Sequence, residues 1–260
     1  MRYMLDEDIA KPRTPTQLAA AGVAFTGAAA TVLLLASLHL LSPEFDPRWR
    51  MVSEYANGHH GWVLSLMFAT WAVSCWALAL AIRSRVRTRA GRIGLLLLVV
   101  AGAGEAGASV FDLNNPLHDL AGALGIPSLP IAVMLISVPL GRTQQWSTAS
   151  RTLLWTANLT WVSLALLVVT FIVMIATYVH AGGDVTTSSS KVPPLPSGVI
   201  ALVGLTNRLL VLADCVWVAV VAGQTIRLRG PSVDVSSGER GRCFYLAPDG
   251  VDASTEPRMN

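Results

Sequence analysis

Hydrophobic residues along the chain are gathered into six long runs, and short polar segments separate each run from the next. Each run approaches or exceeds the roughly 20 residues with which an α-helix crosses the hydrocarbon core of a bilayer. The pattern therefore predicts an all-α fold, a polytopic integral membrane protein whose six transmembrane helices form one bundle. The predicted spans are residues 17–41, 61–82, 93–111, 120–140, 152–180 and 198–226.

The polar segments at the two ends divide the chain into three parts. Residues 1–16 are a short polar leader, residues 17–226 hold the six spans, and residues 227–260 are rich in Ser, Gly and Asp. The first apolar run is longer than the roughly 7–15 residues of a signal-peptide core, so we interpret it as a retained span. The last segment has few large apolar residues, which predicts a disordered tail.

Basic residues are distributed unequally between the two sides of the predicted bundle. Short cytoplasmic loops of membrane proteins hold an excess of Arg and Lys. The leader, the second connection, the fourth connection and the start of the tail fall on one side and carry most of the arginines, whereas the other side carries Arg48, Arg50 and Lys191. This distribution predicts that both termini, and hence the leader and the tail, are cytoplasmic.

Composition agrees with a membrane protein and excludes one class of partner. The chain is 53% hydrophobic and 13% charged, whereas soluble domains have about 25% charged residues. The net charge of +3 comes from arginines beside apolar runs rather than from a basic stripe with aromatic residues, so the expected partner is the lipid bilayer and not nucleic acid. The bias toward Arg, Ala and Gly is typical of GC-rich bacteria, which favours a prokaryotic plasma membrane.

Two predicted spans contain charged residues at depths where lipid is expected. Glu105 lies about six residues, or ~9 Å, below the outward end of the third span. Arg208 lies ~15 Å below the outward end of the sixth span, next to Asn207, and its long side chain could extend toward Glu105. We predict that these two side chains pair, either as part of a site or only to fix how the helices assemble. Asp214 lies deeper and has no evident basic partner, so a proton relay is an alternative.

The densest polar segment, residues 53–62, lies between the first two spans on the outward side. We expect Glu54 to face inward as a ligand or counter-ion. Ser53 is interpreted as a helix N-cap in preference to a nucleophile. The next outward link places Asp112 and His118 at the same membrane level. No His-x-x-x-His or Cys-x-x-Cys spacing occurs, so no metal ligand is predicted, and no motif identifies a cofactor.

Three short motifs resemble a prokaryotic membrane family known as domain of unknown function 998. They are Ser53-Glu54-Tyr55 with Gly61-Trp62, Phe111-Asp112 followed by His118, and Gly204 with Arg208. The resemblance covers about residues 20–225 and implies a six-helix membrane protein without an established activity. It also implies that Ser53, Glu54, Asp112, His118 and Arg208 form one polar set. Phe111 replaces the proline that usually precedes the aspartate.

These observations lead to one preferred function and two alternatives. The preferred hypothesis is an outward-facing polar cavity that binds a lipid headgroup or a small polar ligand, with Arg208 holding an anionic group. Its candidate ligand-binding residues are Glu54, Glu105, Asp112, His118 and Arg208, supported by Ser53, Tyr55 and Asn207. The alternatives are a membrane-embedded hydrolase, with or without a metal, that uses Asp112 and His118, and a small proton-coupled transporter that uses Glu105 and Asp214.

Overall fold

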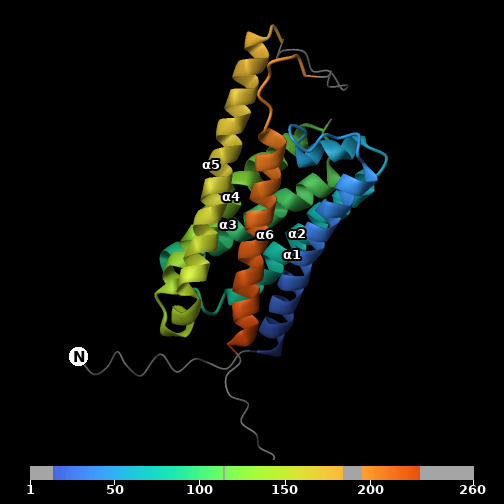
Figure 1. Ribbon diagram of the computed structural model, residues 1–260. Helices are drawn as coiled ribbons and strands as arrows, with labels where there is room; N and C mark the ends of the chain where they lie inside the picture. Colours follow the sequence, from blue (N-terminus) through green and yellow to red (C-terminus); the bar gives the residue numbers. More distant parts are fainter. Residues whose placement is uncertain (1–13, 114, 184–194, 229–260) are drawn as a thin grey trace, which may run out of the picture. The chain divides into compact units, whose positions relative to one another are not determined.

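The computed structural model describes residues 14–113, 115–183 and 195–228, and within them the chain forms helices and turns without a strand. Six helices are long and apolar enough to cross a membrane, which confirms the predicted all-α fold (Figure 1). They are α1 (Pro15–Leu41), α2 (Gly61–Ile82), α3 (Arg89–Val110), α4 (Pro116–Gly141), α5 (Ser150–His180) and α6 (Val203–Arg227). Two short 3-10 helices, η1 (Val52–Asn57) and η2 (Gln144–Ala149), precede α2 and α5.

Local capping signals explain where the helices depart from the predicted spans. Thr88 caps α3 by accepting a hydrogen bond from the Gly91 amide, and Asn115 caps α4 just before Pro116. Capping residues are polar and therefore lie outside the apolar run. Each of these two helices thus begins about one turn before its apolar run does. In contrast, α6 begins later than predicted, since Gly198 adopts a φ of 93° in the left-handed region and turns the chain before the helix starts.

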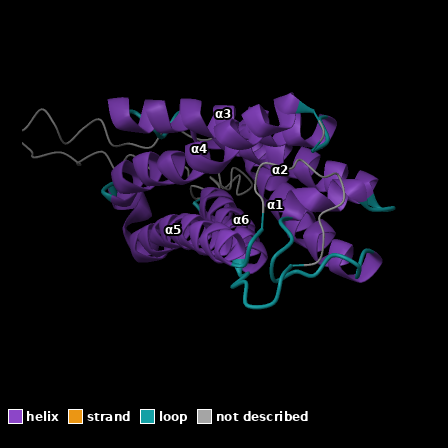
Figure 2. Cartoon of the chain, turned by 90° about the horizontal axis from the view of Figure 1, so that it is seen from above, coloured by secondary structure: helices purple, strands orange, loops and turns teal. Residues whose placement is uncertain are grey.

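The helices pack in chain order around the bundle, and α6 closes it against α1 (Figure 2). The most extensive pair is α3 with α4. A Cβ added at Gly104 of α3 would lie 2.6 Å from the Gly125 amide nitrogen and 2.7 Å from the Ala121 carbonyl oxygen of α4. The two backbones therefore touch at this point, as the small residues of the third span predict.

Large apolar side chains occupy both the interior and the outer face of the bundle. Leu38, Met67 and Trp217 are fully buried, whereas Leu33 and Ile172 are 70% and 59% exposed on the helix surfaces. An apolar outer face is the arrangement that a lipid environment requires, since lipid replaces water around the helices. Six apolar helices with such an outer face suggest a multi-pass membrane protein.

The two ends of the bundle differ in charge and in structure. The arginine end carries the α2–α3 connection at residues 83–88, and α1 begins and α6 ends there (Figure 1). The Gln17 side-chain Nε2 donates to the Ser84 hydroxyl at this end, at 2.8 Å. The opposite end, called the rim end below, carries η1 against the start of α6.

Three predicted segments fall wholly or mainly outside the described residues. They are the leader, of which residues 1–13 are not described, the stretch 184–194 with Lys191, and the tail from residue 229 onward. The cytoplasmic placement of both termini and the division into leader, six-span domain and tail stay predictions.

Candidate functional site

The segment that connects α1 to α2, residues 42–60, is bound to the first turns of α6; we call it the rim segment. The amides of Gly204 and Leu205 donate to the Arg48 carbonyl at 2.9 and 3.3 Å. The Val52 amide donates to Asn207 Oδ1 at 2.9 Å. The first amides of a helix have no partner within the helix. At the start of α6 the Arg48 carbonyl of the rim segment is the acceptor for two of these amides.

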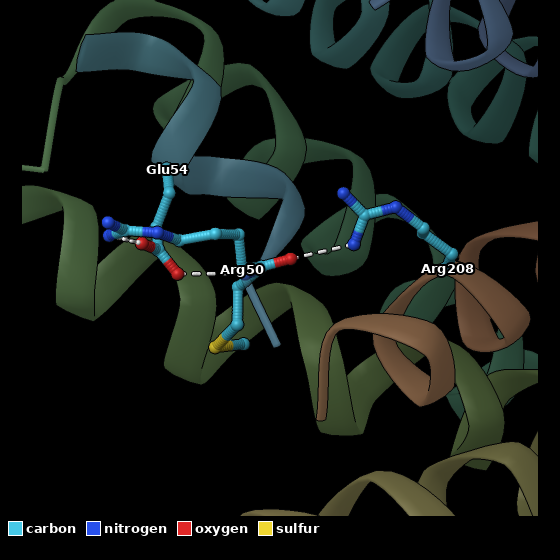
Figure 3. A network of polar contacts seen from close by, with 4 residues as sticks. Arg50, Glu54 and Arg208 are labelled. Carbon is cyan, nitrogen blue, oxygen red and sulfur yellow. Dashed lines mark hydrogen bonds and ion pairs between the residues drawn. The ribbon is translucent and has the colours of Figure 1, made fainter. Parts of the chain in front are cut away.

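Arg208 is the centre of this attachment and is only 6% exposed. Figure 3 shows its guanidinium reaching the Arg50 carbonyl, while the Arg50 side chain turns away toward Glu54. Because a guanidinium has only N–H donors, every contact must be an acceptor. Its Nε donates to His39 Nε2 at 2.7 Å, its Nη2 to the Tyr55 hydroxyl at 3.1 Å, and its Nη1 to the carbonyls of Pro47, Arg50 and Gly204 at 3.2, 2.7 and 2.8 Å.

The protonation of His39 follows from these contacts. Its Nδ1 lies 2.7 Å from the Leu35 carbonyl, which can only accept, so Nδ1 carries the proton. Its Nε2 accepts from Arg208 and is therefore unprotonated, which makes His39 a neutral imidazole. Tyr55 is fully buried and packs edge-on against His39, with ring centroids 6.0 Å apart. The network is thus ordered by aromatic packing as well as by hydrogen bonds.

The predicted pair between Glu105 and Arg208 is wrong. In the described part of the chain, the hydrogen-bond partners of Arg208 are histidine, tyrosine and backbone carbonyls. The physical reason is direction. The arginine side chain extends toward the polar rim, as long cationic side chains in membranes do. Glu105 instead lines a cavity.

Glu54 is a counter-ion, as predicted, but it does not face inward, and Ser53 is not the predicted N-cap. Glu54 accepts from Arg50 Nη1 at 2.6 Å and from the Met51 amide at 2.8 Å. Its carboxylate thus holds the rim segment together instead of facing the cavity. The N-cap of η1 is Met51, and Ser53 lies inside this short helix, where it lines the cavity. A short 3-10 turn puts neighbouring side chains on different faces, which explains why the two residues separate.

A cavity of about 90 Å³ lies beneath the rim segment, between α2, α3, α4 and α6. This volume is enough for several water molecules or a small polar group. Apolar and aromatic side chains make up most of its wall, including Phe68 and Trp71 of α2. Its ionisable and polar lining residues are Ser53, Glu105, His118, Asn207 and Asp214.

Apart from His118, the ionisable side chains of the described cavity wall are acidic. The side chains of Glu105 and Asp214 are 6% and 2% exposed, and none of the described residues that line the cavity is Lys or Arg. Burying a carboxylate is unfavourable unless a cation, a proton or hydrogen bonds compensate it. The described cavity wall provides no lysine or arginine for this purpose, so the compensation has to come from a proton, from hydrogen bonds, from the His118 imidazole or from a bound cation.

Two buried polar atoms at the cavity have no hydrogen-bond partner among the residues that the structure describes. One is Asp214 Oδ1, an acceptor, and the other is Trp71 Nε1, a donor. Buried polar atoms in native proteins almost always have a partner, so each exception needs a physical reason. Both atoms belong to residues that line the cavity.

Neighbouring residues fix the positions of the two other ionisable groups. His118 is 9% exposed, and its Nδ1 donates to the Phe111 carbonyl at 2.8 Å, which holds the imidazole at the end of α3. A Cβ added at Gly125 would lie 3.0 Å from Glu105 Oε1. The glycine therefore leaves room for the carboxyl group of Glu105 on the α4 side of the cavity.

The predicted polar set divides between two places. Glu105 and His118 line the cavity with Ser53 and Asn207. Arg208, Glu54 and Tyr55 belong to the rim network, and Asn207 joins the two by holding Val52. Asp112 is exposed and does not line the cavity.

Sequence reasoning missed some residues of this region. Asp214 was assigned only to the transport alternative, and Trp71 and His39 were not assigned to a site. Trp71 carried a usable signal, because a tryptophan in the middle of a span, away from the interface, needs a partner for its N–H. His39 lies in the last turn of α1, on the same side as the rim segment.

The described residues contain no group of three or more His, Cys, Asp or Glu side chains that could hold a metal ion. A metal-bound hydrolytic water needs about three protein ligands at one point. The arrangement of side chains therefore gives no support to the metal-dependent form of the hydrolase alternative.

Comparisons with known proteins agree with the resemblance found in the sequence. Neither the curated proteins nor the solved structures contain a match to this chain. A family model matches residues 25–224, a range that includes the rim network and every residue that lines the cavity. The chain therefore belongs to the family described as protein of unknown function (DUF998).

Proposed function

We propose that this membrane protein binds a small polar ligand, either free or as the headgroup of a lipid, in the cavity beside Glu105, His118 and Asp214. The observation that carries the proposal is that two residues lining one cavity, Asp214 and Trp71, have buried polar atoms, Oδ1 and Nε1, without a partner in the described part of the chain. A ligand that donates to the first and accepts from the second removes the cost of burying both.

The ligand differs from the one expected from sequence. Arg208 was expected to hold an anionic group, but its guanidinium is occupied by acceptors of its own chain. The cavity presents carboxyl groups in its place. Recognition is therefore assigned to Glu105 and Asp214, and Arg208 keeps the roof of the cavity in position.

The arginine-rich end supports an outward-facing cavity. With residues 83–88 on the cytoplasmic side, the rim end faces outward. Glu105 then lies five residues, or ~8 Å, below the outward end of α3. A headgroup of the outer leaflet could reach this depth without leaving its lipid layer.

Binding is preferred over transport because the opposite half of the bundle is closed. Fully buried apolar side chains of α2, α3 and α6 fill the interior between the cavity and the arginine end. They are Leu78, Ile82, Leu98, Val218 and Val221. A transport path would need polar groups that line a continuous route past Asp214, whereas the buried polar side chains there, such as Trp217 and Ser137, bind each other. Hydrolysis is not preferred either, because no hydrogen bond joins Ser53 to a base in the described residues.

Native mass spectrometry of the protein purified from its membrane tests the proposal. We expect wild type to carry a bound small molecule or lipid that Asp214→Asn and Glu105→Gln both lose. Asp119→Asn is the matched control, since Asp119 is an exposed carboxylate in the first turn of α4 that does not line the cavity. Equal adducts in all four proteins would contradict the proposal, and so would a wild type that gains no adduct from a total lipid extract or from small amines, acids and alcohols.

A further inference from the structure

We infer that the group recognised in the cavity is an organic ammonium with an oxygen atom close to it, as in an amino alcohol, whether free or as a lipid headgroup. The inference rests on the proposed binding function and names the chemistry of its ligand. It follows from three features of the cavity wall: charge, hydrogen-bond demand and aromatic content.

The acidic wall favours a cationic ligand over an anionic one, because an ionised carboxyl group there has no Lys or Arg partner among the described lining residues. Glu105 and Asp214 face the cavity from α3 and α6, and the described lining contains no lysine or arginine to neutralise them. The nearby Arg208 cannot turn inward without releasing His39 and Tyr55. An anionic ligand would meet two carboxyl groups at short range in a medium of low dielectric constant, which is strongly unfavourable.

One ligand that carries both a hydrogen-bond donor and an acceptor could satisfy both of the unpartnered atoms. Asp214 Oδ1 needs an N–H or O–H donor, and Trp71 Nε1 needs an acceptor. An ammonium supplies up to three donors for carboxyl oxygens. A hydroxyl, ester or phosphate oxygen two carbons away supplies the acceptor for the indole.

Aromatic content separates an organic cation from an inorganic one. Phe68 and Trp71 stack with ring planes 6° apart and centroids 6.5 Å apart on the α2 wall of the cavity. Aromatic faces attract ammonium groups, and they bind best the cations that have a weak hydration shell. A metal ion would instead require several ligands at one point, and the described residues contain no group of three or more His, Cys, Asp or Glu side chains that could hold one.

The first experiment compares ligands on wild-type protein and needs no variant. Thermal unfolding is followed in detergent with ethanolamine, with the neutral analogue ethylene glycol, with the anionic analogue glycolate, and with sodium chloride at matched ionic strength. We expect only ethanolamine to raise the unfolding temperature. An equal rise with sodium chloride would overturn the inference in favour of an inorganic cation.

Variants then locate the effect. Asp214→Asn and Glu105→Gln should weaken ethanolamine binding by roughly tenfold or more, because each removes one charge-assisted contact. Asp119→Asn should bind as wild type does. Trp71→Phe keeps a ring and loses the N–H, so it should weaken ethanolamine and have a smaller effect on methylammonium, which has no oxygen. Equal weakening for both amines would overturn the assignment of the indole as a donor to the ligand.

An experiment with lipids distinguishes a free amino alcohol from a lipid headgroup as the ligand. Wild type in nanodiscs of phosphatidylethanolamine should keep the lipid in native mass spectrometry, and in nanodiscs of phosphatidylglycerol it should not. Lipid retention without a response to ethanolamine identifies a headgroup site, and a response to both identifies a site that also accepts the free amine.

Failure of the inference differs from failure of the proposed function. If glycolate, ethylene glycol or phosphatidylglycerol binds and Asp214→Asn abolishes that binding, the cavity is a ligand site but the ammonium assignment is wrong. If no probe binds wild type and no adduct depends on Asp214, both are wrong.

Discussion

Arg208 and Asp214 lie on the same helix within two turns of each other, and both are buried charged residues in an apolar run. Their surroundings are opposite. Arg208 is met by five acceptors of its own chain, whereas Asp214 has an oxygen without a partner in the described structure. A buried charged side chain whose hydrogen-bond partners all belong to the same chain, such as Arg208, holds parts of the structure together. A charge left unsatisfied at a cavity indicates a ligand.

The largest loss of stability should come from removing Arg208, whose donors have acceptors within the chain. Arg208→Ala leaves His39 Nε2, the Tyr55 hydroxyl and three carbonyls without their donor, so we expect a loss of ~3–5 kcal/mol in the free energy of unfolding. Arg208→Lys should rescue little, because an ammonium cannot reach acceptors spread around a planar fork. Thermal unfolding in detergent measures this.

The control for this prediction is Arg227→Ala, on the last turn of the same helix, where the side chain is exposed. It should change stability by less than about 0.5 kcal/mol. If Arg208→Ala unfolds at the temperature of wild type, the rim network does not hold α6, and Arg208 has no stabilising role that sets it apart from Asp214.

A smaller loss is expected where α3 and α4 touch beside the cavity. The Cβ of Gly104→Ala would meet backbone atoms of Gly125 and Ala121 at 2.6 and 2.7 Å, so the helices must separate, at a cost of about 1–3 kcal/mol. Gly223→Ala on α6 is the matched control, because its Cβ meets no described atom within 4 Å. Equal stability of the two variants, measured by thermal unfolding, would show that the contact at Gly104 is not tight.

Sequence alone gave the helices because apolar length is a strong signal, and α2 begins and ends at the predicted residues. It also indicated that Glu105 faces the interior and that Asp214 has no basic partner, since an ionisable group in a span avoids lipid. It could not identify the partners of Arg208. Three of them are backbone carbonyls, which every residue carries, so no residue type marks them in the sequence. The inward orientation predicted for Glu54 failed for a related reason, because the 3-10 geometry of η1 decides which way it turns.

Replacing Asp214 should change the stability in the opposite direction. Asp214→Asn removes the buried ionisable carboxyl group and keeps the side-chain shape, so the ligand-free protein should gain about 1–2 kcal/mol of stability while it loses ligand binding. Asp119→Asn should do neither. Thermal unfolding of delipidated protein measures the first effect. A destabilised Asp214→Asn variant that keeps its fold would mean that the carboxylate is satisfied within the chain, like Arg208.

The smallest and sharpest comparison uses one change at two tryptophans. Trp217 Nε1 donates to Ser137 Oγ at 2.9 Å inside the core, while Trp71 Nε1 has no partner among the described residues. Trp→Phe removes the same atoms at both positions, so the difference between the two variants reports mainly on the hydrogen bond. In ligand-free protein we expect Trp217→Phe to cost about 1 kcal/mol more than Trp71→Phe, because only the former leaves a buried hydroxyl without its donor. Addition of ethanolamine should narrow this gap, since the ligand gives the Trp71 N–H of wild type a partner that the phenylalanine variant cannot use. A gap that is unchanged by the amine would place the ligand away from Trp71.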